Sequence, residues 1–264
     1  MDKGYSGNLG LLARAGYAAR GVVYVIVGSM AALAALGPGG ETPDSEGALV
    51  QVLGAPFGKF LLVTIAAGLL CYACWRAVQA LLDADSHGTD AKGLAIRSGL
   101  LVSAITHLGL TFVALGLVFG LGSGGSGSSS QEWTARLMSE SYGSWLVAAV
   151  GLVVMATGIA HGIKAWRADF ARRFSMSGDE RSLMLPISRF GLFARGAVFL
   201  IIGGFFAVAA IQQDPNEARG LSGALQALHS QPYGWILLGI VSLGLLAFGL
   251  YSIIESIYRR IGMP

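Results

Sequence analysis

Six long apolar stretches constrain this chain more than any other feature of its sequence. A helix needs about 20 mostly apolar residues to cross the hydrocarbon core of a bilayer, and each stretch reaches that length once its ends are included. In lipid, backbone polar groups must be bonded within their own segment, which favours helices. The sequence therefore predicts an all-α, polytopic integral membrane protein with six spans, near residues 18–37, 58–82, 96–121, 144–167, 190–211 and 233–258.

The composition also indicates lipid as the solvent. Of the 264 residues, 54% are hydrophobic and 12% are charged, about half the charged share of a typical soluble domain. The net charge of +3 is small and no basic run alternates with aromatic residues, so nucleic acid is not an expected partner. The first residues, MDKGYSGNLGLLARAG, lack the pattern of a cleaved signal peptide, so the first stretch is expected to remain as a span.

Lysine and arginine are distributed unequally between the two sides of the predicted spans. If the N-terminus lies in the cytoplasm, 15 of the 18 fall on inner segments and inner helix ends, and the outer loops hold only Lys59, Arg136 and Arg219. Cytoplasmic segments of membrane proteins carry such an excess. Both termini are therefore expected in the cytoplasm.

The sequence repeats itself along the chain. Residues 14–24 (RAGYAARGVVY) match residues 189–199 (RFGLFARGAVF), and residues 47–58 (GALVQVLGAPFG) match residues 223–234 (GALQALHSQPYG). The middle third keeps the spacing and loses several of the residues. One membrane domain, 1–264, is thus predicted to hold three parallel-repeated hairpins of two spans around a pseudo-threefold axis, in units of approximately 11–85, 94–168 and 186–260.

These repeated residues resemble the bacterial domain-of-unknown-function family numbered 1206, whose members carry three such two-helix units. The resemblance covers nearly the whole chain and implies this fold in a bacterial inner (plasma) membrane. It implies no biochemical activity, because the family is named for lacking one. In the middle unit Ser103 replaces the arginine and His107 the aromatic residue. The residues that carry the resemblance are Arg14, Gly16, Tyr17, Arg20, Gly21, Tyr24, Gly28, Gly47-Ala48-Leu49, Phe57-Gly58 and Tyr72 through Arg76.

Polar residues recur just inside the predicted spans. The 16 residues from Gly21 to Leu36 make about 24 Å of helix, which is short of the ~30 Å hydrocarbon core. The helix must therefore continue inward past Arg20. The same spacing predicts one polar layer near the cytoplasmic face, formed by Arg20, Arg76, Ser103, His161, Arg195 and Ser252.

Three uses of Arg20, Arg76 and Arg195 are open. Their long side chains could reach anionic lipid headgroups from this depth and so anchor the helices. Alternatively, they could face the pseudo-threefold axis and bind an anionic ligand or lipid headgroup through bidentate contacts. They could also pair with Glu255, Asp83 or the carbonyls at helix C-termini.

His107 and His161 are the candidates for a haem or metal site, because they lie on adjacent predicted spans. Their depths differ by about one helical turn, roughly 5–6 Å. No second histidine pair or carboxylate supports them. Hydrogen bonding of buried histidines across helices is therefore the expectation, and no cofactor is expected.

Glycines seven residues apart lie on one stripe of a helix and predict close packing between helices. Such faces join spans of one chain or dock a partner membrane protein. The pairs are Gly21 and Gly28, Gly109 and Gly116, Gly151 and Gly158, and Gly196 and Gly203.

The sequence contains no Walker loop, Rossmann fingerprint, nucleophile elbow or zinc-protease motif, so an enzyme is not expected. The favoured hypothesis is an accessory, scaffold or assembly subunit that packs against a larger membrane complex, for example an energy-converting one. The alternative is a three-repeat channel or carrier for a small anionic solute along the pseudo-threefold axis. The expected partners are the lipid bilayer, anionic lipid headgroups and a membrane protein.

Overall fold

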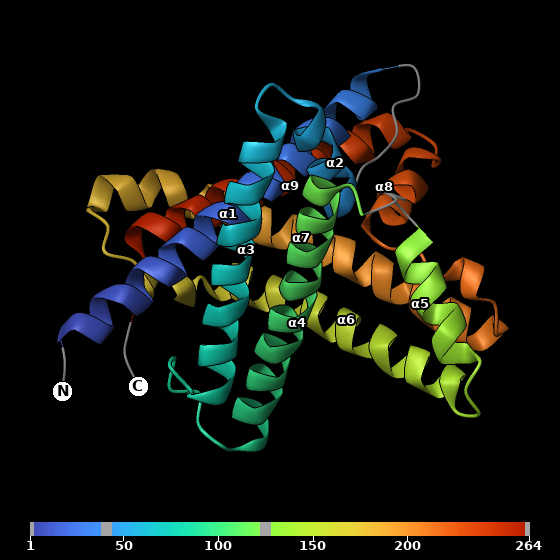
Figure 1. Cartoon of the computed structure of the whole chain (residues 1–264), viewed down its shortest axis with the longest axis horizontal. Coiled ribbons are helices and arrows are strands. Elements are labelled where there is room, and N and C mark those ends of the chain that lie inside the picture. The colour runs from blue at the N-terminus through green and yellow to red at the C-terminus, as the bar shows by residue number, and fades with distance from the viewer. Residues whose placement is uncertain (1–2, 38–43, 122–127, 262–264) are drawn as a thin grey trace.

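The computed structural model describes residues 3–37, 44–121 and 128–261, and these residues form helices and no β-strand (Figure 1). Six helices are long and apolar enough to cross a membrane, which confirms the predicted all-α class and the six spans. They are α1 (Lys3–Leu36), α3 (Gly58–Leu81), α4 (Ala91–Phe119), α6 (Gly143–Arg167), α7 (Gly178–Gln212) and α9 (Gly234–Tyr258).

Each repeat unit has the same order of helices. The first spans are α1, α4 and α7, and the second spans are α3, α6 and α9. Short helices α2 (Ser45–Gly54), α5 (Ser128–Met138) and α8 (Leu221–His229) connect them, with 3-10 turns η1 (Asp169–Arg173) and η2 (Pro215–Glu217) elsewhere in the connections. Helix α7 starts well before its apolar stretch, because Ser177 and Glu180 form a capping box at its N-terminus.

Each first span packs against the second span of the preceding unit. Helix α4 packs on α3 and α7 packs on α6, while α1 packs on α9 (Figure 1). One arginine of each first span donates to carbonyls at the C-terminal end of that neighbour, where helical carbonyls lack intrahelical partners. The bonds are Arg14 Nη1 to Ser256 O (2.7 Å), Arg97 Nε to Ala80 O (2.7 Å) and Arg189 Nε to Ala165 O (3.0 Å). We call this end of the bundle the arginine end.

The two spans within a unit also pack together in the first and third units. Helix α1 contacts α3 and α7 contacts α9, but α4 and α6 scarcely touch over the described residues. The glycine at the equivalent position of the three first spans shows this difference between the units. A Cβ at Gly16 would lie 2.5 Å from the backbone of Tyr72, and one at Gly191 would lie 2.3 Å from Phe248, whereas Gly99 has nothing within 4 Å. The predicted ring of hairpins is therefore open between α4 and α6.

Side-chain size explains the opening. In the third unit, a Cβ at Gly244 would lie 2.1 Å from Cβ of Ala194, and Ala19 and Gly68 make the same close approach in the first unit. The middle unit has valines at these two positions, Val102 and Val153. Two branched side chains prevent the backbone approach that small residues allow.

The glycines of the predicted stripes lie mostly at the interfaces between units. Gly21 and Gly28 face α9, while Gly151 and Gly158 on α6 face Gly203 and Gly196 on α7. At Gly109 the prediction of close packing is wrong, because this exposed residue has no atom within 4 Å of its Cβ position. Gly116, its partner on α4, is half-buried.

Candidate functional site

Arg20 is buried and fully engaged with neighbouring helices. Its Nη2 donates to Glu255 Oε2 (2.6 Å), its Nε donates to Ser252 Oγ (3.1 Å), and its Nη1 donates to the hydroxyl of Tyr72. Glu255 and Ser252 belong to α9 and Tyr72 belongs to α3. Arg20 is 4% exposed, so its guanidinium does not reach toward lipid headgroups. Of the three uses considered, Arg20 has the pairing with Glu255.

The ion pair of Arg20 continues into a network that covers the arginine end. Glu255 Oε1 accepts from Arg259 Nη1 (2.8 Å), and Arg259 Nη2 donates to Asp85 Oδ2 (2.9 Å). Asp85 also accepts from Arg173 Nη1 (2.9 Å). Burial alone would raise the pKa of the Asp85 carboxyl, but Arg259 and Arg173 outweigh it and hold that pKa below its ordinary value. The network thus joins α1 and α9 to the segments that follow α3 and α6.

Arg76 is half-buried and bonds mainly within its own helix. Its Nε donates to the Tyr72 hydroxyl (2.7 Å) and its Nη1 donates to Gln79 Oε1 (3.1 Å). The Tyr72 hydroxyl therefore accepts from both Arg20 and Arg76. These two arginines share a hydrogen-bond acceptor, which places them in one cluster.

Arg195 is the exception among the three arginines. It is 9% exposed, and its Nε and Nη1 atoms have no hydrogen-bond partner among the described residues. Its Cζ lies among three rings, 4.3 Å from the centroid of Phe248, 4.7 Å from Tyr24 and 4.8 Å from Phe199. Cation–π contacts of this kind stabilise a cation partially, but a buried charge ordinarily also has ionic or hydrogen-bond partners. Arg195 therefore has free donors at a buried site.

The repeat explains why Arg195 has no counter-ion among the described residues. Arg20 and Arg195 occupy the same position in the first and third units, on helices that each pack against the second span of the preceding unit. Glu255, the partner of Arg20, lies on α9, and the equivalent residue on α6 is Lys164. Lys164 Nζ donates to the Tyr251 hydroxyl (2.7 Å). In the aligned repeats a cation therefore stands at the position from which Glu255 binds Arg20.

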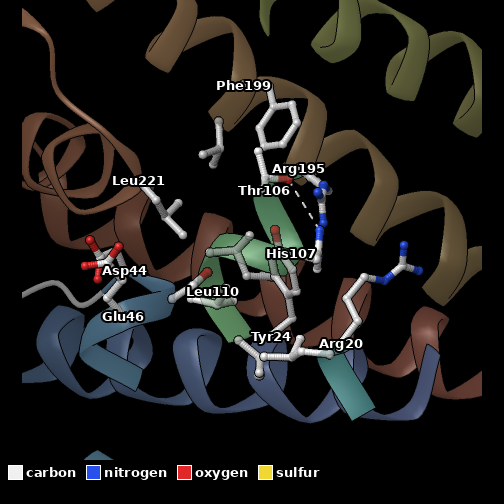
Figure 2. Close-up of a pocket in the computed structure, with 15 residues that line it drawn as sticks. Arg20, Tyr24, Asp44, Glu46, Thr106, His107, Leu110, Arg195, Phe199 and Leu221 are labelled. Atoms are coloured by element: carbon white, nitrogen blue, oxygen red, sulfur yellow. Dashed lines mark hydrogen bonds between the residues drawn. The ribbon is translucent and has the colours of Figure 1, made fainter. Parts of the chain in front are cut away.

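A cavity of about 300 Å³ lies beside Arg195 (Figure 2). All three first spans line it with equivalent residues. Val23, Thr106 and Val198 occupy one repeat position and Tyr24, His107 and Phe199 occupy the next. Because equivalent residues of three repeats surround it, the cavity lies on the pseudo-threefold axis. Leu69 of α3 and Leu245 of α9 complete this wall, again at equivalent positions.

The two sides of the cavity carry opposite charge. Figure 2 shows Asp44 and Glu46, at the start of α2, on one side and Arg20 and Arg195 on the other. The guanidinium of Arg20 is directed away from the cavity. Asp44 Oδ1 also accepts from Gly47 N (2.8 Å) and so caps α2. The sequence reasoning missed these two carboxylates, because it assigned them to an outer loop.

The two candidate histidines bond to their own helices. His107 Nδ1 lies 2.8 Å from Ser103 O, and His161 Nδ1 lies 2.8 Å from Thr157 O. The His107 ring packs on Tyr72 at 4.5 Å between centroids, and that of His161 packs on Phe199 at 5.6 Å. Over the ranges that the structure covers, no group of three or more His, Cys, Asp or Glu could hold a metal ion.

The repeat pattern also identifies the chain's relatives. The model of a Domain of Unknown Function family, DUF1206, matches the chain three times, at residues 15–83, 98–168 and 190–259. The chain belongs to the DUF1206 family. This confirms the resemblance stated above, and each match falls within one of the three predicted units. The three DUF1206 matches include most of both spans of every unit.

A curated relative extends this DUF1206 assignment without adding an activity. "Uncharacterized protein YxxB" of Bacillus subtilis (strain 168) is 35% identical over 250 residues, which cover 94% of this chain and 90% of the relative. No solved structure matches the chain. The function of this DUF1206 protein must therefore be argued from its own residues.

Proposed function

We propose that this DUF1206 protein binds an anionic ligand in the cavity on its pseudo-threefold axis, with Arg195 as the principal contact, and acts as a carrier for that ligand. The observation that carries the proposal is the buried guanidinium of Arg195, a residue that lines the cavity and whose Nε and Nη1 have no hydrogen-bond partner among the described residues. An acid group is the ligand chemistry that a guanidinium binds most strongly, through charge-assisted hydrogen bonds. Arg195 belongs to the set of residues predicted to bind an anion at this axis.

Energetics support this reading of Arg195. Desolvation of an ion in a protein costs several kcal/mol, and the cost is offset only by a counter-ion and hydrogen bonds. Arg20 has both in Glu255, whereas Arg195 has no ion pair among the described residues, and the repeat position of Glu255 holds Lys164 on α6. An anionic ligand would supply the missing charge. The cavity of about 300 Å³ lies at the lower limit of the usual size of small-molecule sites.

The arginine end supports a carrier more than an open channel. There the buried chain of Arg20, Glu255, Arg259 and Asp85 joins helices across the bundle. Passage of a solute toward that end would require these ion pairs to separate. Binding in a cavity that is closed toward the arginine end, followed by a conformational change, is the behaviour that such a closed end supports.

The binding test compares purified wild-type protein with an Arg195→Gln variant in neutral detergent. Acetate, inorganic phosphate and dodecanoate serve as probes, and the melting temperature is measured at increasing concentrations of each. At least one probe is expected to raise the melting temperature of the wild type and not of Arg195→Gln. Arg172→Gln is the matched control, because Arg172 has an 82% exposed side chain and is not among the residues that line the cavity. If no probe acts on the wild type, or if Arg195→Gln responds equally, the proposal fails.

The accessory-subunit hypothesis is the second candidate, and one observation favours it. Helices α4 and α6 are the least buried spans and leave an apolar opening between them. A transmembrane helix of a larger complex would fit a gap between two spans. Affinity purification from native membranes in mild detergent tests this, and elution of the protein alone, or only with its own copies, would remove the support.

The proposed setting is a bacterial inner membrane with both termini in the cytoplasm. The arginine end carries Arg14, Arg97, Arg189 and Arg173, and cytoplasmic ends of membrane proteins are rich in such residues. Cysteine accessibility at Ser175, near η1, is expected from the cytoplasmic side and not from the periplasmic side.

A further inference from the structure

We infer that the ligand of Arg195 is an anionic amphiphile that enters the cavity sideways from the bilayer, between α4 and α6, and leaves its hydrocarbon chain in that opening. This inference rests on the proposed binding of an anion at Arg195 and adds the class of ligand and its route. It follows from which walls of the cavity are closed, which wall is missing and how large the cavity is.

The missing wall faces lipid. Helices α1, α4 and α7 line the cavity, together with residues of α2, α3, α8 and α9, but the described residues of α5 and α6 contribute none. Thr106 lines the cavity and is exposed, and it lies near the middle of the span α4. An opening at the middle of a membrane span meets acyl chains rather than water. The valines Val102 and Val153, which keep α4 and α6 apart, are both about half exposed at the same opening.

The other routes are unfavourable for an anion. At the arginine end the buried ion pairs of Glu255 with Arg20 and Arg259 close the bundle. On the opposite side the carboxylates of Asp44 and Glu46 line the cavity, and negative charge at an entrance repels an approaching anion. The lateral opening carries no acidic residue among those that line the cavity from α4. An anion therefore reaches Arg195 most easily from the bilayer.

The size and lining of the cavity require a ligand with an apolar part. A volume of about 300 Å³ equals that of roughly ten liquid water molecules, which accommodates an acid group and a short length of chain but not a whole lipid. Most of the lining between the two charged sides is apolar, with Leu69, Leu110 and Leu245 among its residues. A longer chain must leave the cavity, and the opening between α4 and α6 leads it into lipid. The acid group itself is a carboxylate or a phosphate, since a guanidinium binds both.

A chain-length series separates this inference from the proposed function. Protein in phosphatidylcholine nanodiscs is titrated with acetate, inorganic phosphate, dodecanoate, dodecyl phosphate and the neutral dodecanol. Binding is taken as the difference between the signals of the wild type and of Arg195→Gln. This subtraction removes the contribution of probe that partitions into the bilayer. Dodecanoate or dodecyl phosphate is expected to bind at least about tenfold more tightly than acetate and phosphate, a difference of about 1.4 kcal/mol, and these two arms distinguish a carboxylate from a phosphate. Equal affinity for short and long acids overturns the amphiphile while leaving anion binding intact, and no Arg195-dependent binding overturns both.

The route is tested by obstructing the opening. Thr106→Trp places a large ring at the exposed wall and is expected to weaken binding of the long-chain acid by about tenfold or more. Thr64→Trp is the matched control, because Thr64 is likewise exposed on a span, α3, and its hydroxyl also donates to a carbonyl of its own helix. Both variants are checked for folding by size exclusion. Unchanged binding in Thr106→Trp overturns the lateral route.

Photolabelling locates the chain independently of any variant. A long-chain fatty acid with a diazirine near its middle is bound and irradiated, and the labelled peptides are identified by mass spectrometry. Labels are expected on α4 and α6, near Thr106 and Val153, and are expected to decline in Arg195→Gln. Equal labelling of all six spans, with no effect of Arg195→Gln, overturns the inference.

Discussion

Replacement by methionine should destabilise the protein strongly at Arg20 and only slightly, if at all, at Arg195. The two residues occupy the same position in different units, and methionine retains much of the length and apolar volume of the arginine stem. Arg20→Met removes the partner of Glu255 and the donors to Ser252 and Tyr72. Breaking a buried ion pair costs about 3–5 kcal/mol, and the free energy of unfolding should fall by that amount.

Arg195→Met removes a buried charge with no counter-ion. The loss consists of cation–π contacts with Tyr24, Phe199 and Phe248, which are worth about 0.5–2 kcal/mol each. The gain is relief of a desolvation penalty of several kcal/mol. The two terms nearly balance, so Arg195→Met should leave the free energy of unfolding within about 2 kcal/mol of the wild type.

The assay is reversible unfolding by steric trapping in neutral bicelles without added anions. Arg172→Met serves as the exposed control and should stay within about 0.5 kcal/mol of the wild type. A loss of 3–5 kcal/mol in Arg195→Met, equal to that in Arg20→Met, would refute the reasoning. It would mean that Arg195 has a structural partner in the folded protein and that the cavity is not built around a free cation.

Three further predictions concern the framework of the site. Asp85 stabilises the fold at neutral pH because its pKa is lowered, so this contribution should vanish as the pH falls through about 4 and below. The free energy of unfolding of Asp85→Asn should lack this acid-dependent decrease. A decrease that persists in the variant would exclude Asp85 as its source. Gly191→Ala forces a methyl group against the backbone of α9 and should lower the melting temperature sharply. Gly109→Ala meets open space and should leave the melting temperature unchanged or raise it, because alanine gains up to about 1 kcal/mol of helix propensity. Similar shifts in both variants would contradict the packing described. The double variant Val102→Ala, Val153→Gly introduces the small residues that the other units have at these positions and should close the opening between α4 and α6. The closure is measured as a shorter distance between spin labels on the two helices. An unchanged distance would show that these valines do not hold the opening apart.

The sequence predicted the spans and the repeat because both depend on local composition and spacing. It placed Arg20, Arg76 and Arg195 at one depth but left their use open, because the partner of each depends on which second span lies opposite. Once α9 is known to pack on α1, and α6 on α7, the change from Glu255 to Lys164 can be read from the aligned repeats. The same holds for Val102 and Val153, whose size matters only at a contact. The carboxylates of Asp44 and Glu46 could not be placed, because the packing of α2 against α1, α3 and α4 is a tertiary contact that no local pattern encodes.

The arginines that hold the ends of α3, α6 and α9 have a consequence for how such a molecule could arise. The contact of α1 with α9 repeats those of α4 with α3 and of α7 with α6, although it joins the first and last units rather than consecutive ones. Three separate copies of one two-span unit could therefore assemble with the same interfaces, as a homotrimer. In a homotrimer any substitution appears three times, so its side walls open together or not at all. Linking three copies into one polypeptide removes that restriction, and it allows a single wall to open while the other two keep the bundle together.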